Sequence, residues 1–349
     1  MPSDWCARCS ASESSKREEL QTHPGAFAVL LTLAIAYTLI SGATDGGSLL
    51  AAAAASRVVS PLHSLCIIAL GVLVGPIIFG TAVAATIAVG IADYPRLGAS
   101  LLAAGIAGGL ATRVIMYFAG VPTSGSVALV GAMVGSLWAG PGLSAVNWHG
   151  VAKVAIALVA SPLAGFVAGA LAYAVVLLFL SFVSRRIGDR LMRFQYATIA
   201  LQALAYGAND AEKTVGLFAA ALLVAGGGNS FAAPLWTIAL TAATFTIGML
   251  FGGMRIARTI GNRLYSIRSP HALAFQTAAA LTVLGAASLG APMSSTQTAT
   301  SAILGVGAGD NPRSVQWRTA GRIVSSWALT APTALGAGAV AALCLRLFR

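Results

Sequence analysis

The chain consists largely of long apolar runs separated by short stretches rich in Arg, Gly, Pro and Ser. Several runs reach the roughly 20 residues that a helix needs to cross the hydrocarbon core of a bilayer. The runs fall at 26–56, 62–91, 97–119, 122–140, 151–183, 194–225, 231–254, 271–290, 292–309 and 320–346. Some are too long or too rich in glycine for one plain helix, and 26–56, with Gly42, Gly46 and Gly47, is expected to be broken. The pattern predicts an all-α membrane protein with about 10–12 transmembrane or re-entrant helices.

The composition excludes an ordinary water-soluble fold. Of the 349 residues only 9% are charged, and the mean hydropathy is +0.84, whereas an average soluble domain has roughly 25% charged residues. A net charge of +11 would suggest nucleic acid as a partner of a soluble protein. Here the arginines lie mainly in the loops between apolar runs, where their distribution primarily indicates which loops face the inside of the membrane. We therefore expect membrane lipid, and no nucleic acid, as a partner.

The basic residues also predict an orientation in the plasma (inner) membrane. With the N-terminus outside, the loops placed inside carry Arg57, Arg185, Arg186, Arg190, Arg193, Arg255, Arg258, Arg263, Arg268, Arg313, Arg318 and Arg322. The outside set is Arg8, Lys16, Arg17, Arg96, Lys153, Arg346 and Arg349. Twelve against seven favours an integral membrane protein with both termini outside.

Two halves of the chain resemble each other. Ser41-Gly-Ala-Thr-Asp45 matches Tyr206-Gly-Ala-Asn-Asp210, and Pro122-Thr-Ser-Gly-Ser126 matches Pro292-Met-Ser-Ser-Thr296. The same spacing continues in Gly135 with Gly305 and in Pro162 with Pro332, and Trp148 matches Trp317 with a shift of one residue. An odd number of crossings per half then makes the second half an inverted copy of the first, a plan used by many secondary transporters. The expected domains are a polar tail at 1–24, a first repeat at 25–183, a basic cytoplasmic linker at 184–193 and a second repeat at 194–349.

Few ionisable side chains lie within the apolar runs. Asp45, Asp210, Glu212 and Lys213 sit inside or at the mouth of a run, whereas Asp93, Asp189 and Asp310 are expected in loops. Ionisable groups at membrane depth are costly and usually mark an ion or substrate pathway. The glycine before each aspartate predicts unwound backbone, which would offer carbonyl oxygens to a small cation. The alternative is that these groups lie at helix ends and reach water.

The two proline-containing segments predict a different kind of site. Proline followed by Ser or Thr is typical of a helix start, and a helix N-terminus offers N–H donors, hydroxyl groups and partial positive charge to an anion. Ser124, Gly125 and Ser126 follow the first proline. Ser294, Ser295 and Thr296 follow the second one. The alternative is ordinary capping of two membrane helices.

Together these motifs resemble the inorganic phosphate transporter family, also called the Pit or sodium-phosphate symporter group. The likeness extends from about residue 26 over nearly the whole chain and includes the stretch from Arg322 to Pro332. It implies a secondary active symporter rather than an enzyme, with no cofactor other than a coupling H⁺ or Na⁺. It further implies that Thr44, Asp45, Asn209 and Asp210 bind the coupling cation or proton, and that Ser124, Gly125, Ser126, Ser294, Ser295 and Thr296 bind phosphate. We add Lys213 to the expected phosphate ligands because of its charge. As partners it points to inorganic phosphate, and it leaves open a homodimer and a PhoU-like accessory protein.

The sequence also departs from the family pattern. The family usually has Asn-Asp in both halves and a further Asn three residues on, whereas this chain has Thr44 in the first half and Ser48 and Lys213 at the later positions. A lysine at an expected sodium ligand favours coupling to protons. Sulfate or another oxyanion remains an alternative substrate, and a channel or a non-transporting scaffold with the same fold remains an alternative function.

The remaining signals are weak. Cys6 and Cys9 form a lone CxxC in the polar tail, and a structural zinc site needs about four ligands. The four histidines share no metal-binding spacing, and His63 and His271 are expected at the membrane interface. No Gly-Lys-Ser/Thr motif occurs, which excludes a Walker A ATPase. We therefore expect no metal site.

Overall fold

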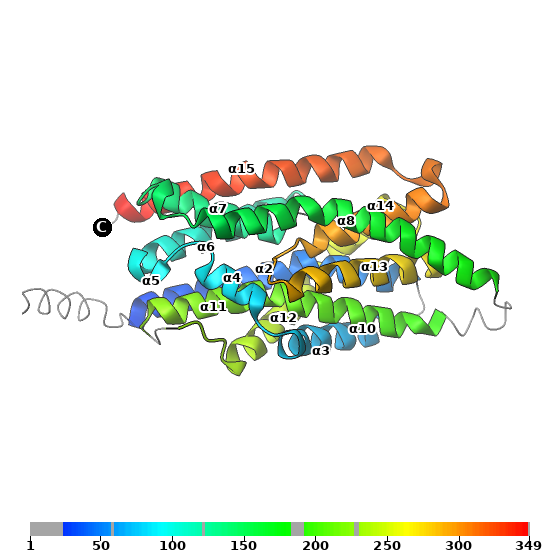
Figure 1. Ribbon diagram of the computed structural model, residues 1–349, viewed down its shortest axis with the longest axis horizontal. Coiled ribbons are helices and arrows are strands. Elements are labelled where there is room, and N and C mark those ends of the chain that lie inside the picture. The colour runs from blue at the N-terminus through cyan, green and yellow to red at the C-terminus, as the bar shows by residue number, and fades with distance from the viewer. Residues whose placement is uncertain (1–23, 57–58, 121–122, 183–191, 227–229, 348–349) are drawn as a thin grey trace, which may run out of the picture.

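The computed structural model describes residues 24–56, 59–120, 123–182, 192–226 and 230–347, and all regular elements within these ranges are helices (Figure 1). The first half contains α2 (Pro24–Ser56), α3 (Pro61–Phe79), α4 (Ala82–Val89), α5 (Tyr94–Leu97), α6 (Ala99–Phe118), α7 (Gly125–Ala139) and α8 (Trp148–Ser181). The second half contains α10 (Gln195–Tyr206), a π-helical turn (Gly207–Ala211), α11 (Glu212–Val224), α12 (Leu235–Arg263), α13 (Ser269–Ser288), α14 (Ser295–Asp310) and α15 (Trp317–Leu347).

Seven of the described helices are long and apolar enough to cross a membrane, namely α2, α3, α6, α8, α12, α13 and α15. Each predicted apolar run corresponds to one helix or to a pair of consecutive helices. The run 62–91 divides at Gly80, which has a φ of 83° that only glycine adopts easily, and the run 194–225 is interrupted by the π-helical turn. The prediction of an all-α membrane protein is confirmed. The polar tail 1–23, its CxxC and most of the basic linker lie outside the described residues.

The predicted break in the first apolar run was wrong, because α2 is a continuous α-helix through Gly42 and Gly46. These glycines allow close packing instead. A side chain at Gly42 would overlap the backbone carbonyl of Phe245, and one at Gly46 would overlap the side chain of Met249. Both neighbours belong to α12, so the glycines bring α2 and α12 into contact rather than unwinding the helix.

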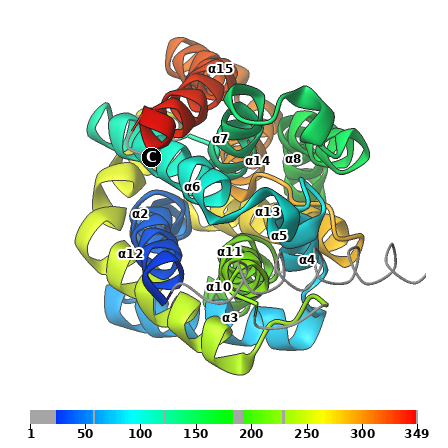
Figure 2. The same cartoon turned by 90° about the vertical axis from the view of Figure 1, so that its left-hand side faces the viewer.

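The helices form one bundle in which α11 is enclosed by the others, and α10 precedes it along the same line (Figure 2). The enclosed residues include Asn209, Asp210, Glu212 and Lys213, which are at most 8% exposed. Many apolar side chains of α8 and α15 are exposed on the outside of the bundle. A protein with polar groups enclosed and leucine, valine and phenylalanine outside is suited to a lipid environment.

Two helical hairpins enter the bundle from opposite ends (Figure 1). The first is α6–α7 and the second is α13–α14. Their tips meet inside, where the Ser126 Oγ donates a hydrogen bond to the Met293 carbonyl at 3.0 Å. The far end of α7 lies beside the C-terminal end of α15, since Arg346 donates to the Gly140 carbonyl. An inverted repeat would require this opposed arrangement of the hairpins.

The second helix of each hairpin packs against the long helix of the other half. Helix α7 lies against α15, and α14 lies against α8. Gly135 and Gly305, which the sequence pairs as equivalent positions, make these contacts close. A side chain at Gly135 would overlap the Leu335 carbonyl, and one at Gly305 would overlap the Phe166 carbonyl. Each half therefore packs one helix of its hairpin against the long helix of the other half, and the two halves are not separate bodies.

A cluster of polar side chains holds the C-terminal end of α14 in place. Asp310 is the last residue of α14 rather than part of a loop as predicted. Its carboxylate accepts hydrogen bonds from the hydroxyl groups of Tyr173 (2.5 Å) and Tyr265 and lies 3.5 Å from the His271 Nε2. The hydroxyl donors lower the pKa of Asp310, Tyr173 more than Tyr265. His271 is buried at the start of α13.

Candidate functional site

The two hairpin tips present helix N-termini to the middle of the bundle. Ser124 caps α7, with its Oγ accepting a hydrogen bond from the Val127 N–H at 3.2 Å. Ser294 caps α14 in the same way, accepting from the Gln297 N–H at 3.3 Å. Both serines are buried. Helix starts are therefore found where the sequence predicts them, although Pro122 lies outside the described residues.

The π-helical turn of the second half holds the second tip. The Asn209 Nδ2 donates to the Met293 carbonyl at 2.9 Å and to the Ser295 Oγ at 2.7 Å. A π-helical turn inserts an extra residue into the helix and is frequent at functional sites. It presents Asn209 and Asp210 to the tip, so the motif is locally irregular as predicted, but wound as a wide helix rather than unwound.

Asp45 on α2 connects both hairpins. Its Oδ1 accepts a hydrogen bond from the Thr296 Oγ1 at 2.8 Å, and its Oδ2 lies 2.7 Å from the Arg113 Nη2. The Arg113 guanidinium also donates to the Thr44 Oγ1 and to the Tyr37 hydroxyl. Asp45 and Arg113 are 3% and 1% exposed, so this ion pair is shielded from water by the protein. The carboxylate thus joins a residue of the second tip to a cation of the first hairpin.

Asp210 has a cation of its own. The Lys213 Nζ lies 2.7 Å from the Asp210 Oδ1 and donates to the Met293 carbonyl, also at 2.7 Å. Both side chains are buried. Lys213 therefore stands at the second tip between the aspartate and the backbone of the hairpin.

Arg113 was missed in the sequence-based prediction. It belongs to α6, close to the first tip, where a side chain at Gly125 would overlap its Nη1. The Tyr37 hydroxyl donates to the Gly125 carbonyl at 2.8 Å and so completes the attachment of this tip. The available signal was a single arginine inside the apolar run 97–119, since an intramembrane cation usually has a functional partner.

Glu212 has a structural role. Its Oε2 accepts hydrogen bonds from the backbone N–H groups of Val83 (2.9 Å) and Ala84 (3.2 Å), at the start of α4. The Thr81 side chain makes no capping hydrogen bond there. A carboxylate satisfies free N–H groups at a helix N-terminus and interacts favourably with the helix dipole. Glu212 therefore attaches α4 to α11.

All the predicted site residues lie in this one region of the bundle. Those predicted for the cation are Thr44, Asp45, Asn209 and Asp210, and those predicted for phosphate are Ser124, Gly125, Ser126, Ser294, Ser295, Thr296 and Lys213. The arrangement combines hydroxyl groups, two helix N-termini and two cations, which suit an oxyanion. It also contains two buried oxygen atoms, the Asn209 Oδ1 and the Asp210 Oδ2, that have no hydrogen-bond partner in the described part of the chain. No group of three or more His, Cys, Asp or Glu side chains that could hold a metal ion occurs within those residues.

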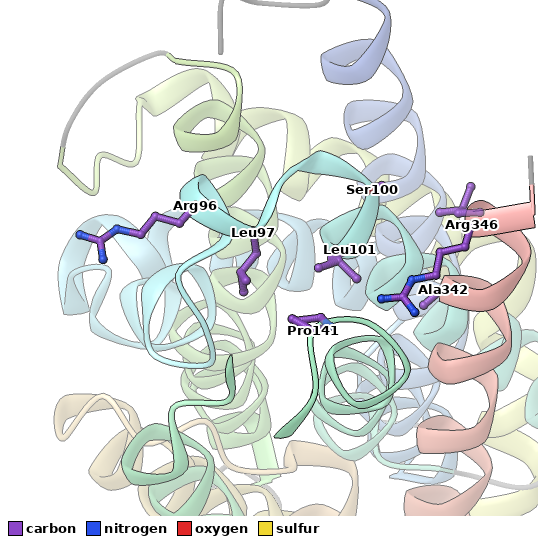
Figure 3. Close-up of a pocket in the computed structure, with 8 residues that line it drawn as sticks. Arg96, Leu97, Ser100, Leu101, Pro141, Ala342 and Arg346 are labelled. Atoms are coloured by element: carbon purple, nitrogen blue, oxygen red, sulfur yellow. The ribbon is translucent and has the colours of Figure 1, made fainter. Parts of the chain in front are cut away.

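A cavity of about 250 Å³ lies elsewhere, at the end of the bundle near the C-terminus (Figure 3). It is lined by Arg96, Leu97, Ser100, Leu101, Pro141, Ala342, Leu345 and Arg346. None of these is a predicted site residue. Arg96 is paired with Asp93, and Arg346 donates to the Gly140 carbonyl, so both cations already have partners.

Comparison with known proteins gives a consistent result. The model of the phosphate transporter family matches residues 41–187 and 179–338. A probable low-affinity inorganic phosphate transporter of Rhizobium meliloti is 32% identical over 317 residues, covering 90% of this chain and 94% of the relative. One of Mycobacterium tuberculosis is 35% identical over 310 residues, covering 88% of this chain and 74% of the relative. A solved structure described as the sodium-dependent phosphate transporter has a TM-score of 0.81 at 21% identity, covering 93% of this chain and 100% of that one. At this identity the likeness shows the fold.

Proposed function

We propose that this chain, which belongs to the phosphate transporter family, is a secondary active symporter that carries inorganic phosphate across a cell membrane together with a proton. The observation that supports proton coupling is that each buried aspartate has a cation of the protein beside it. Arg113 pairs with Asp45, and Lys213 pairs with Asp210. The four side chains have no net charge when all are ionised, so the site is balanced without sodium.

Phosphate binds between the hairpin tips. The Ser124 and Ser294 caps lie at two helix N-termini, and Ser126, Ser295 and Thr296 add hydroxyl groups next to them. Hydrogen bonds from N–H and O–H donors to a charged oxyanion are stronger than those between neutral groups. The tips contact each other, so a phosphate ion between them would contact both halves of the protein.

The proton enters through the aspartates. A phosphate anion near Arg113 or Lys213 competes with the carboxylate for the same cation. When a proton binds to the Asp45 or Asp210 carboxylate, that carboxylate becomes neutral, and the released cation can pair with a phosphate oxygen. Proton and phosphate therefore favour each other's binding, as coupled transport requires.

Sodium coupling is the second candidate, and a specific observation supports it. The Asn209 Oδ1 and Asp210 Oδ2 are buried oxygen atoms without a hydrogen-bond partner in the described residues, and such oxygen atoms suit a small hard cation. The solved structure with the same fold is named a sodium-dependent transporter. Against this, Lys213 already supplies positive charge to the same carboxylate.

The test is uptake of radiolabelled phosphate by proteoliposomes under imposed gradients. We expect an inward proton gradient to drive uptake, and an inward sodium gradient at equal pH on both sides to have little effect. Excess unlabelled sulfate should compete weakly, whereas unlabelled phosphate should compete fully. Sodium-driven uptake would refute proton coupling. Sulfate competing as well as phosphate would refute the choice of substrate, and no uptake at all would favour a scaffold.

We also propose that residues 25–183 and 194–349 form two inverted repeats joined by the basic linker 184–193, with both termini outside the plasma membrane. The opposed hairpins and the matched glycines at positions 135 and 305 support the repeat. Labelling of single cysteines near residue 24 and near residue 347 with an impermeant reagent on intact cells tests the orientation. Reaction at both positions is expected.

A further inference from the structure

A row of polar side chains follows one face of α10 from the bundle end toward the candidate site. It consists of Gln195, Thr198 and Gln202, and Asn209 at the second tip lies seven residues beyond Gln202. Fourteen residues of helix span about 21 Å. The row faces α13, because the Gln195 Nε2 donates to the Ser269 carbonyl at 3.1 Å and the Thr198 Oγ1 donates to the Gln276 Oε1 at 2.6 Å. We call this contact the α10–α13 seam.

Gln202 is the unusual member of the seam. It is 1% exposed, and both its Nε2 and its Oε1 lack a hydrogen-bond partner among the described residues. The Gln195 Oε1 is also buried without one. A primary amide enclosed in a membrane protein without partners is strongly unfavourable, so such a group is explained by water or a polar ligand that reaches it. Between Gln202 and the candidate site the seam is apolar and closed, because Ala205 packs with Ala280 and Val283 of α13.

The equivalent contact in the first half is mainly apolar, and its polar group is the Tyr37 hydroxyl, which is hydrogen-bonded to Gly125 and Arg113. The repeat register pairs Gln195, Thr198 and Gln202 with Leu30, Leu33 and Tyr37, and it pairs Gln276 with Ile106. Leu30, Tyr37 and Ile106 belong to one buried apolar cluster, and Leu33 packs against it. The two opposed hairpins thus meet their neighbours through different chemistry. The first does so mainly through apolar side chains, and the second through amides and hydroxyls from Gln195 to Gln202. Packing needs common to both repeats therefore do not explain the polar seam.

We infer that the α10–α13 seam is the hydrated route by which phosphate passes between the candidate site and the end of the bundle where α10 and α13 begin. The inference rests on the proposed function. Amide and hydroxyl groups can exchange hydrogen bonds with water and with phosphate oxygens, and they carry no charge that would hold the anion in place. The Gln195 and Thr198 hydrogen bonds close the seam, and movement of α13 away from α10 would break both of them and open the route.

Cysteine accessibility tests this inference. In a variant in which Cys6, Cys9, Cys66 and Cys344 are replaced by serine, we would introduce Gln202→Cys or, as the matched control on the same helix, Ala203→Cys, which is buried against Gly71 of α3. Each is treated with a charged, membrane-impermeant methanethiosulfonate reagent in right-side-out and in inside-out vesicles. We expect modification of Gln202→Cys from one side, at least tenfold faster than modification of Ala203→Cys, and slowed several-fold by phosphate. Equal and slow modification of both would overturn the route.

A cross-link gives a second measurement that does not depend on reagent access. Thr198→Cys combined with Gln276→Cys places two thiols across the seam, where the native side chains are in contact. Oxidation should abolish phosphate uptake, and dithiothreitol should restore it. Full uptake by the cross-linked protein would overturn the route.

The parent without cysteines separates the two proposals. If it takes up phosphate while Gln202→Cys stays unreactive, the route fails and the proposed function stands. If it takes up no phosphate, the proposed function fails, and the reactivity of Gln202→Cys still decides whether the seam is hydrated.

Discussion

Replacing Arg113 by glutamine removes the cation from the Asp45 ion pair and leaves a buried carboxylate. The pair has a 2.7 Å contact, and both residues are at most 3% exposed. Breaking such a pair by removing one partner costs about 3–5 kcal/mol, because the remaining charge has no compensation. The hydrogen bond from Thr296 to Asp45 persists and is a small offset. We expect Arg113→Gln to lower the free energy of unfolding by about 3 kcal/mol, which is more than a hundredfold in the equilibrium constant.

A double-mutant cycle separates the ion pair from general damage to the fold. Asp45→Asn alone leaves Arg113 without its carboxylate and should cost a similar amount. Arg113→Gln combined with Asp45→Asn removes both charges. The double variant should therefore lose less unfolding free energy than the two single variants lose in sum, by about 2 kcal/mol or more. It should nevertheless transport no phosphate, because both the fixed cation and its proton-accepting partner are lost.

The measurements are denaturant unfolding of the detergent-solubilised protein, followed by tryptophan fluorescence, and phosphate uptake after reconstitution. Arg113→Lys is the matched control, because it keeps the charge but has a single nitrogen in place of the two that Arg113 uses, Nη2 toward Thr44 and Nη1 toward Tyr37. It should retain more stability than Arg113→Gln. Additive losses in the cycle, or a wild-type rate of uptake by Arg113→Gln, would refute the reasoning.

Three further predictions concern single contacts. Lys213→Asn should lose most proton-driven uptake and acquire partial dependence on sodium, because the charge of Asp210 is left uncompensated. If the variant keeps its coupling ion and shows only a weaker affinity for phosphate, the lysine merely attracts phosphate. Glu212→Ala should destabilise the protein by about 1–3 kcal/mol, because it leaves two N–H groups of α4 without an acceptor. Glu212→Gln should retain much of that stability, because its amide oxygen can still accept. Equal unfolding curves for the two variants would contradict the capping role. Asp310→Asn should lower stability by about 1 kcal/mol at pH 7. Because the folded pKa of Asp310 is lowered, this advantage of the wild type should persist above about pH 4 and shrink as the pH falls further; an advantage that grows on acidification, in unfolding measured from pH 3 to 7, would contradict it.

The helices and hairpin tips were predictable because their signals are local. An apolar run defines a span by its length, and Ser124 and Ser294 identify helix starts through their own neighbours in the sequence. The repeat then indicated which distant segments would meet, so the predicted ligands are gathered in one place.

Tertiary contacts account for the failures. In the sequence, Gly42 predicts unwinding, but whether a glycine breaks a helix or allows a neighbouring helix to approach depends on what packs against it, in this case α12. Arg113 lies 68 residues from Asp45 in the chain and outside any repeated motif, so no local pattern links them. The capping role of Glu212 depends in the same way on α4, which is distant in sequence.

The packing of each half against the other has a consequence for biosynthesis. Helix α7 packs against α15, and α15 leaves the ribosome long after α7, because most of the second half lies between them in the chain. Until α15 is synthesised, the face of α7 at Gly135 lacks its contact with α15, so the first hairpin stays incompletely packed in the membrane or in the translocon. Shortening the chain within α15 would therefore damage the first half as much as the second, although every residue of the first half is present.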